Sequence, residues 1–250
     1  MYRGLAAGLL PIVAVTGQAL AADLPPPSPS RAPAVYVPVV APVYNWGGFY
    51  IGINGGWGFA SGTTTATLTG TGVAGLDGTS ATGSGSLNGG VAGGQIGANY
   101  QIDALVIGIE GDFDWSGQKR TDNFACGAGC TVSETIKLPW IATIRGRFGY
   151  AIDRVLLFGT GGVAFTHASD NVTATGFGTI FTASSTNVGW TIGAGGEVAL
   201  AQNWTAKIEY LYIATDVKQS GALSVVSGTV SETAKIHDNL IRAGVNFKFP

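Results

Sequence analysis

The chain has 250 residues, of which 40 are glycine and 11% are charged, and its formal net charge is −2. This composition excludes both the basic footprint of a nucleic-acid-binding protein and an acidic tail. The mean hydropathy of +0.29 is high for a protein with so few charges. No run of 18 or more apolar residues occurs beyond the N-terminus, so a transmembrane helix does not account for that value. The apolar residues must therefore be distributed over strands.

Residues 1–21 have the features of a secretory signal peptide. Arg3 gives the positive start, Leu5 to Val15 form a short apolar core, and Ala19-Leu20-Ala21 gives the small-residue cleavage pattern. A retained membrane anchor is the alternative, but the apolar core is shorter than the ~20 residues that a spanning helix needs. Residues 22–43 are rich in proline, which favours neither helix nor sheet, and are predicted to form an extended periplasmic tether.

The stretch NWGGFYIGINGGWGFASG, residues 45–62, places apolar side chains at every second position. Phe49, Ile51 and Ile53 begin this alternation, and Trp57 and Phe59 continue it. Side chains two residues apart in a β-strand point to the same face of the sheet. The stretch is therefore predicted to be a strand with one apolar face and one small or polar face.

The same alternation recurs to the end of the chain and predicts eight strands: Gly48–Ala60, Gly89–Gln101, Leu105–Trp115, Lys137–Ala151, Val155–His167, Asn187–Ala199, Trp204–Thr215 and Ile236–Phe249. Short connections alternate with long polar ones, which are Ser61–Asn88, Ser116–Ile136, Ala168–Thr186 and Asp216–Lys235. Short periplasmic turns and long extracellular loops are typical of bacterial outer-membrane barrels. The predicted fold class is all-β, an eight-stranded antiparallel transmembrane β-barrel over residues 44–250.

A soluble β-sandwich is the alternative for a chain of short alternating strands. The face predicted to point outward carries no charge and includes Leu105, Ile109, Leu138, Ile144, Ile192 and Ile241. The other face carries eight charged residues: Glu110, Asp112, Arg145, Arg147, Glu197, Lys207, Glu209 and Arg242. A sandwich core could not bury so many charges cheaply. A basic residue facing lipid near the midplane costs roughly 2–4 kcal/mol, so a register slip of one residue is excluded as well.

Aromatic residues of the outward face gather at two depths, as interfacial anchoring requires. The predicted girdle near the short turns consists of Phe49, Tyr100, Tyr150, Trp204 and Phe249. The predicted girdle near the loops consists of Trp57, Phe59, Trp115, Trp140, Trp190 and Tyr212. The apolar face is therefore predicted to contact outer-membrane lipid.

Four segments resemble the outer-membrane immunogenic proteins of alphaproteobacteria, which are porin-like surface antigens of OmpA-like architecture. They are AADLPPP, YNWGGFYIGINGGWGFA, IRGRFGYAIDRVLLFGTGGVAF and NLIRAGVNFKF, and the resemblance extends over the mature chain. It implies an outer-membrane location and an eight-stranded barrel, and some members of that family bind hemin. It also implies that the barrel-assembly machinery reads a C-terminal aromatic residue, here Phe249, which is followed by Pro250.

Motifs for catalysis, cofactors or metals are weak. His167 and His237 are far apart in the sequence and lack the further ligands of a zinc site, so no metal, cofactor or catalytic residue is predicted. Cys126 and Cys130 lie in a predicted extracellular loop, where oxidation is expected and no other cysteine competes. A disulfide between them is predicted, with two free thiols as the alternative.

The eight inward charges have two interpretations. One is a salt-bridged plug, with Glu110 paired to Arg145 and Glu209 to Arg242, because eight strands leave an interior that side chains just fill. The other is a charged constriction that selects solutes. The predicted function is that of a surface-exposed structural scaffold with a plugged lumen, possible extracellular ligands at the loops and no nucleic-acid partner. The alternative is a narrow porin or a hemin-binding uptake protein.

Overall fold

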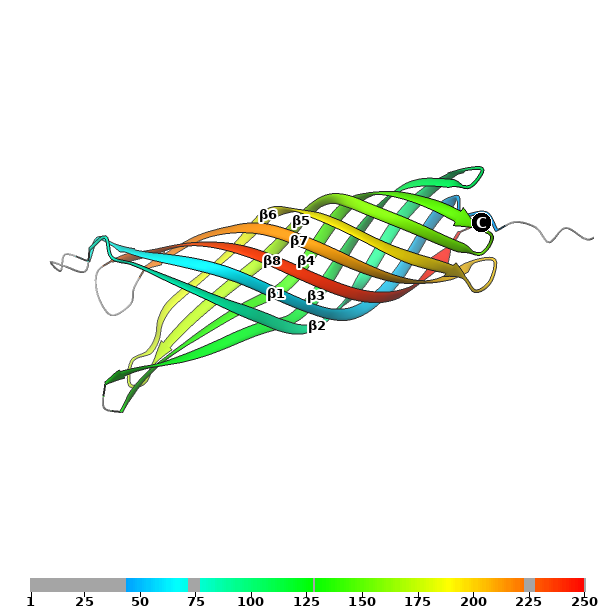
Figure 1. Ribbon diagram of the computed structural model, residues 1–250. Coiled ribbons are helices and arrows are strands. Elements are labelled where there is room, and N and C mark those ends of the chain that lie inside the picture. The colour runs from blue at the N-terminus through cyan, green and yellow to red at the C-terminus, as the bar shows by residue number, and fades with distance from the viewer. Residues whose placement is uncertain (1–43, 72–76, 128, 223–227, 250) are drawn as a thin grey trace, which may run out of the picture. The chain divides into compact units, whose positions relative to one another are not determined.

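The structure, a computed structural model, describes residues 44–71, 77–127, 129–222 and 228–249. The predicted signal peptide and tether lie outside these ranges. The described residues form a closed barrel in which each strand pairs with the next along the chain (Figure 1). The strands are β1 (Gly48–Thr69), β2 (Ser80–Ile102), β3 (Leu105–Gly127), β4 (Cys130–Ile152), β5 (Val155–Ala174), β6 (Gly178–Ala199), β7 (Trp204–Ala222) and β8 (Thr229–Lys248). This confirms the predicted fold class.

The barrel is closed by an antiparallel ladder between its first and last strands. This β1–β8 ladder runs from Tyr50 opposite Lys248 to Thr69 opposite Thr229. Below it, the amide of Phe249 donates to the carbonyl oxygen of Phe49 at 2.9 Å. In the part of the chain that the structure describes, no helix is long and apolar enough to span a membrane.

Two of the short connections are two-residue turns that each contain an aspartate with positive φ. Asp103 has a φ of 52° and Asp153 a φ of 50°, a conformation that aspartate adopts more readily than most residues. The third short connection, between β6 and β7, is held by the amide of Leu200 donating to the carbonyl oxygen of Trp204 at 2.9 Å. All three lie at the end of the barrel that carries the C-terminus (Figure 1).

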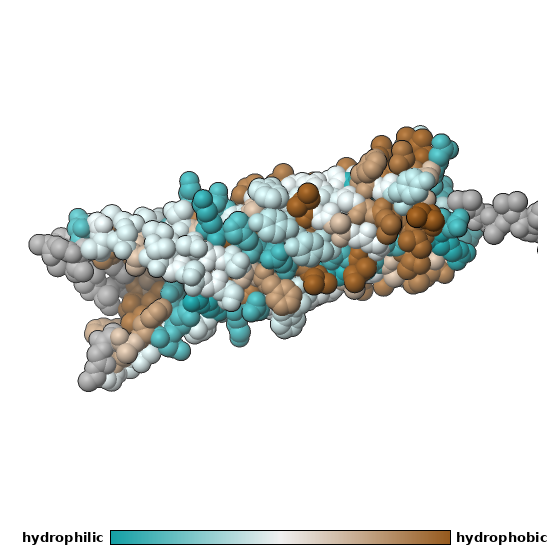
Figure 2. Space-filling model, in the orientation of Figure 1, coloured by the Kyte–Doolittle hydropathy of each residue, from teal (hydrophilic) through white to brown (hydrophobic). Residues whose placement is uncertain are grey.

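In the membrane-spanning part of the barrel, the side chains predicted to point outward lie on its outer surface, and the charged side chains predicted to point inward lie in its lumen. Outward side chains are exposed, as Ile53 (71%), Ile109 (67%) and Ile144 (64%) show, whereas the inward Arg145 is 1% exposed. In Figure 2, hydrophobic side chains concentrate toward the end with the C-terminus, and the opposite end is more polar. The apolar band therefore surrounds the half of the barrel nearer the short turns.

The strands are longer than predicted, and the prediction of four long polar loops is wrong. β3 continues beyond Trp115 to Gly127, and β4 begins at Cys130 rather than Lys137. The other three predicted loops are also mostly strand. Threonine has a high strand propensity, and backbone pairing continues in water even where side chains on both faces are polar. The polar composition that suggested loops therefore belongs to a solvated extension of the barrel.

The extension divides into two four-stranded sheets. The β2–β3 ladder ends at the pair Asn88–Lys119, and the β6–β7 ladder ends at the pair Gly189–Thr215. Beyond these levels the outer ends of β3, β4, β5 and β6 stay paired with one another, and so do those of β7, β8, β1 and β2. We call these sheets the first arm and the second arm; they separate at the far end in Figure 1.

The predicted outward position of Leu138 is also wrong, because this side chain is 1% exposed and lies inside the barrel. The β4–β5 register shifts between Lys137 and Trp140, and the β3–β4 register shifts between Trp115 and Gln118. Pro139 lies within this irregularity and has no amide to donate to a ladder. The bulge reverses the inward and outward alternation above Pro139.

Hydrogen–deuterium exchange of the folded protein tests the strand extension. Amides of residues 61–67 and 80–86 belong to the β1–β2 ladder, so they should exchange at least about tenfold more slowly than in an unstructured peptide of the same sequence. Exchange of the ladder residues at the rate of the unstructured peptide would contradict the extension.

Candidate functional site: the barrel lumen

An aromatic cluster packs inside the barrel at the short-turn end. Tyr44 and Trp46, just ahead of β1, are 9% and 2% exposed and pack with Val106, Leu156 and Phe158. The Trp46 amide donates to Gln101 Oε1 at 2.6 Å. The chain therefore enters the barrel mouth before it joins the wall, which the strand pattern did not predict.

A layer of ion pairs fills the lumen above this cluster. Glu110 and Arg145 are direct cross-strand neighbours, and Arg145 Nη2 lies 2.6 Å from Glu110 Oε1. The same guanidinium contacts Asp112 at 2.7 Å and also pairs with Glu209 on β7. These four side chains are at most 1% exposed. Arg145 thus joins both predicted pairs into one network across the barrel.

Arg242 is the second centre of this network. Its guanidinium lies 2.8 Å from Asp112 and 2.9 Å from Glu209, and it also pairs with Asp114. Lys207 Nζ lies 2.8 Å from Glu110 and 3.6 Å from Glu209. Glu110, Asp112 and Glu209 therefore each pair with two or more cationic side chains, whereas Asp114 pairs with Arg242.

Arg147 and Glu197 form a separate buried pair nearer the short turns. The Arg147 guanidinium stacks over the Phe158 ring at 3.9 Å from its centroid. Glu197 also accepts a hydrogen bond from Asn246 at 2.9 Å, and Asn246 in turn accepts one from Gln95 at 2.6 Å. A chain of side-chain amides thereby ties this pair to strands β8 and β2.

Two layers of buried apolar side chains lie in the lumen on the other side of the ion pairs. The nearer layer consists of Val91, Ile141, Ala164, Leu211, Ile213 and Leu240. The farther layer consists of Ala60, Leu87, Leu138, Ala168, Val217, Ala234 and Ile236. Between them, Gln118 Nε2 donates to Asp238 Oδ1 at 2.8 Å. The charged layer is therefore enclosed by apolar side chains from both ends.

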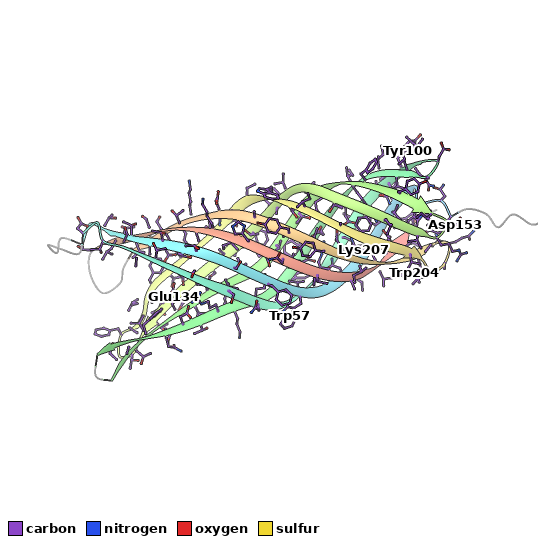
Figure 3. All side chains as sticks on the ribbon, in the orientation of Figure 1. Trp57, Tyr100, Glu134, Asp153, Trp204 and Lys207 are labelled. Atoms are coloured by element: carbon purple, nitrogen blue, oxygen red, sulfur yellow. The ribbon has the colours of Figure 1, made fainter. Side chains whose placement is uncertain are left out.

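Beyond the farther apolar layer lies a cavity of about 130 Å³ between the two arms. Glu134, Asp170 and Glu232 line it, together with Arg120 and Asp122. Burial and the nearby carboxylates of Glu232 and Glu134 raise the pKa of Asp170 to about 7. Figure 3 shows Glu134 well beyond Trp57, on the hairpin side and away from the short turns. This cavity is thus outside the membrane-spanning part.

The eight charged residues predicted to face the lumen are all buried there, but the prediction missed several of their partners. Asp114 continues the alternation of Glu110 and Asp112 and pairs with Arg242. Tyr50 lies on the inward face of β1 and donates to Glu110 Oε2 at 2.6 Å. Both residues lie at inward positions of the strand alternation. Applying that alternation to every polar side chain of the sequence would have identified them.

The predicted girdle residues lie on the outer wall, and nine of the eleven are exposed. Trp140 and Tyr212 are half-buried because histidine rings stack on them, His167 at 5.5 Å and His237 at 5.9 Å between centroids. Figure 3 shows Tyr100 and Trp204 at the short-turn end, with Trp57 farther along the barrel. The two histidines therefore belong to the outer surface and do not face the lumen.

A closed antiparallel ring with an apolar outer band and a charged interior defines the class of outer-membrane β-barrels. The chain belongs to the outer membrane protein beta-barrel domain family, whose profile matches residues 8–249. It is 34% identical over 238 residues to the 31 kDa outer-membrane immunogenic protein of Brucella melitensis, covering 92% of this chain and 93% of the relative. These similarities place the protein in the cell outer membrane.

Two further similarities concern another relative and a solved structure. The chain is 30% identical over 245 residues to the 25 kDa outer-membrane immunogenic protein of Brucella canis, covering 98% of this chain and 96% of the relative. The outer membrane protein OprG of Pseudomonas aeruginosa aligns with a TM-score of 0.46 at 13% identity, covering 81% of this chain and 97% of that one.

Replacing Arg145 by alanine should strongly destabilise the barrel. Glu110, Asp112 and Glu209 would each lose a buried cationic partner, and breaking a buried pair costs about 3–5 kcal/mol. Urea unfolding in lipid vesicles measures the loss, and adding Glu110→Ala should restore part of it. Arg120→Ala is the matched control, because the Arg120–Asp122 pair at 2.6 Å is about 30% exposed and should contribute at most about 1 kcal/mol. Strictly additive effects of the two changes would contradict the coupling.

The predicted disulfide lies at the tip of the β3–β4 hairpin. The side chain of Cys126 is outside the described residues, so the bridge stays a prediction. A thiol probe should not label the unreduced protein, and replacing both cysteines by serine should leave the unfolding midpoint almost unchanged, because the closed ring is very short. Quantitative labelling without reductant would show that the bridge is absent.

Proposed function

We propose that this protein is a structural scaffold of the outer membrane that presents its two arms at the cell surface and has a closed lumen. The buried network around Arg145 and Arg242 is the observation that carries the proposal. It joins β3, β4, β7 and β8 by direct ion pairs. A solute would have to break these pairs and also displace the apolar layers on either side. No catalysis is part of this role.

Three partners complete the proposed role. Lipid covers the apolar band, and the barrel-assembly machinery recognises β8, whose end is followed by the exposed Phe249. An extracellular ligand would contact the arms. Because these are paired strands rather than the long loops that the sequence suggested, such a ligand would meet an ordered surface.

Single-channel recording in planar bilayers tests the closed lumen. The parent protein, with insertion verified separately, should give no steady conductance steps. Steady steps whose ion selectivity changes in the Arg145→Ala variant would reject the scaffold with a plug and support the narrow porin.

A hemin titration addresses the uptake alternative. His167 contacts Thr186 at 3.0 Å and His237 contacts Tyr212 at 2.8 Å on the outer wall, so neither offers an axial ligand inside the barrel. The Soret band should show no saturable shift at one hemin per barrel. A saturable shift that His167→Ala or His237→Ala abolishes would support hemin binding at the surface instead.

A further inference from the structure

Three carboxylates from opposite sides of the barrel meet in the cavity between the arms. Glu134 on β4 and Asp170 on β5 belong to the first arm, and Glu232 on β8 belongs to the second. One carboxylate oxygen from each lies within 4.8 Å of the others. No backbone ladder joins β2 to β3 or β6 to β7 at this level. Side chains of like charge thus face each other where the two arms are not otherwise paired.

Asp170 lies in this cavity with one of its two carboxylate oxygens lacking a hydrogen-bond partner among the described residues. The residue is 2% exposed, and among the residues that the structure describes none donates to its Oδ1 atom. Other buried carboxylates of the lumen, such as Glu110 and Glu209, have cations within 3 Å. Among the described residues, Arg120 is the one guanidinium that lines the cavity, and it is paired with Asp122 and donates to the Ser84 carbonyl oxygen. A cationic partner for Asp170 is therefore missing from the described side chains.

A fourth oxygen is available from Gln219 on β7. This residue is directly opposite Glu232, and its Nε2 atom donates to Glu232 Oε2 at 2.7 Å. Its Oε1 atom has no partner among the described residues. Like the three carboxylates, Gln219 lines the cavity. The second arm thus contributes one carboxylate and one amide oxygen, and the first arm two carboxylates.

We propose that Glu134, Asp170, Glu232 and Gln219 form a Ca²⁺ site that ties the two arms together. Carboxylate and amide oxygens are the ligands of hard divalent cations, and Ca²⁺ accepts them at about 2.3–2.6 Å in flexible geometry. Ligand oxygens on opposite sides of Ca²⁺ can be about 5 Å apart, which suits the spread of this cluster. Mg²⁺ requires a tighter octahedron at about 2.0–2.1 Å, which fits less well. Water would complete the coordination shell from the cavity.

Calcium titration of the full mature chain tests the site. The protein is refolded in an uncharged maltoside detergent without lipopolysaccharide, so that no phosphate competes for the ion. Isothermal titration with CaCl₂ should show one site per barrel, with a dissociation constant in the range of about 10⁻⁴–10⁻³ M that is typical of extracellular calcium sites. Asp170→Asn and Glu232→Gln should each weaken binding at least about tenfold.

Asp122→Asn is the matched control, because Asp122 lines the same cavity but is already paired with Arg120. The calcium affinity of the Asp122→Asn variant should equal that of the parent protein. Asp170→Asn removes a buried negative charge beside two other carboxylates and should fold, which the gel shift between heated and unheated samples verifies. Glu134→Gln gives a further ligand variant with the same expected loss. Absence of saturable binding in the parent, or equal binding in Asp170→Asn, would overturn the proposal.

Hydrogen–deuterium exchange then asks whether the ion joins the arms. With calcium, exchange should slow at the outer ends of both β4 and β8 in the parent and should stay unchanged in Asp170→Asn. Protection that is confined to one arm, or that persists in the variant, would overturn the bridging role.

Discussion

The antiparallel ladder between β1 and β8 is the contact on which the rest of the structure depends. In hydrocarbon, each backbone amide and carbonyl must be paired within the protein, and an open sheet would leave two edges unpaired. The other ladders join strands that are neighbours in the chain, whereas this one joins its two ends. Once the ring is closed, consecutive side chains along each strand face lipid and the lumen in turn. Burial of the charged residues follows from closure.

Closure also explains why the lumen charges form a network rather than isolated pairs. A ring of eight strands brings β3, β4, β7 and β8 within reach of one another's side chains. Arg145 and Arg242 each contact carboxylates on more than one strand. A carboxylate held between two cations recovers more of its lost hydration than one held by a single cation, and this offsets the cost of burial.

The period of two sufficed to predict the fold class, the eight inward charges and the facing of Glu110 toward Arg145, because these depend only on alternation and on hairpin register. It failed at Leu138, since the bulge at Pro139 adds a residue to one strand and reverses the alternation. It also failed to predict the length of the strands, because strands that are in water on both faces need no alternation of apolar and polar residues. The meeting of Glu134, Asp170 and Glu232 depends on strands far apart in sequence and could not be read from any local pattern.

The end of the β2–β3 and β6–β7 ladders at Asn88 and Gly189 has a consequence for how this surface can evolve. Below that level a substitution that disturbs one strand disturbs both of its neighbours and, through them, the seal against lipid. Above it each arm is a separate sheet, so a change in one arm does not reach the other arm through the backbone ladders. The outer half of the protein can therefore vary in sequence one arm at a time, while the membrane-spanning half stays constrained.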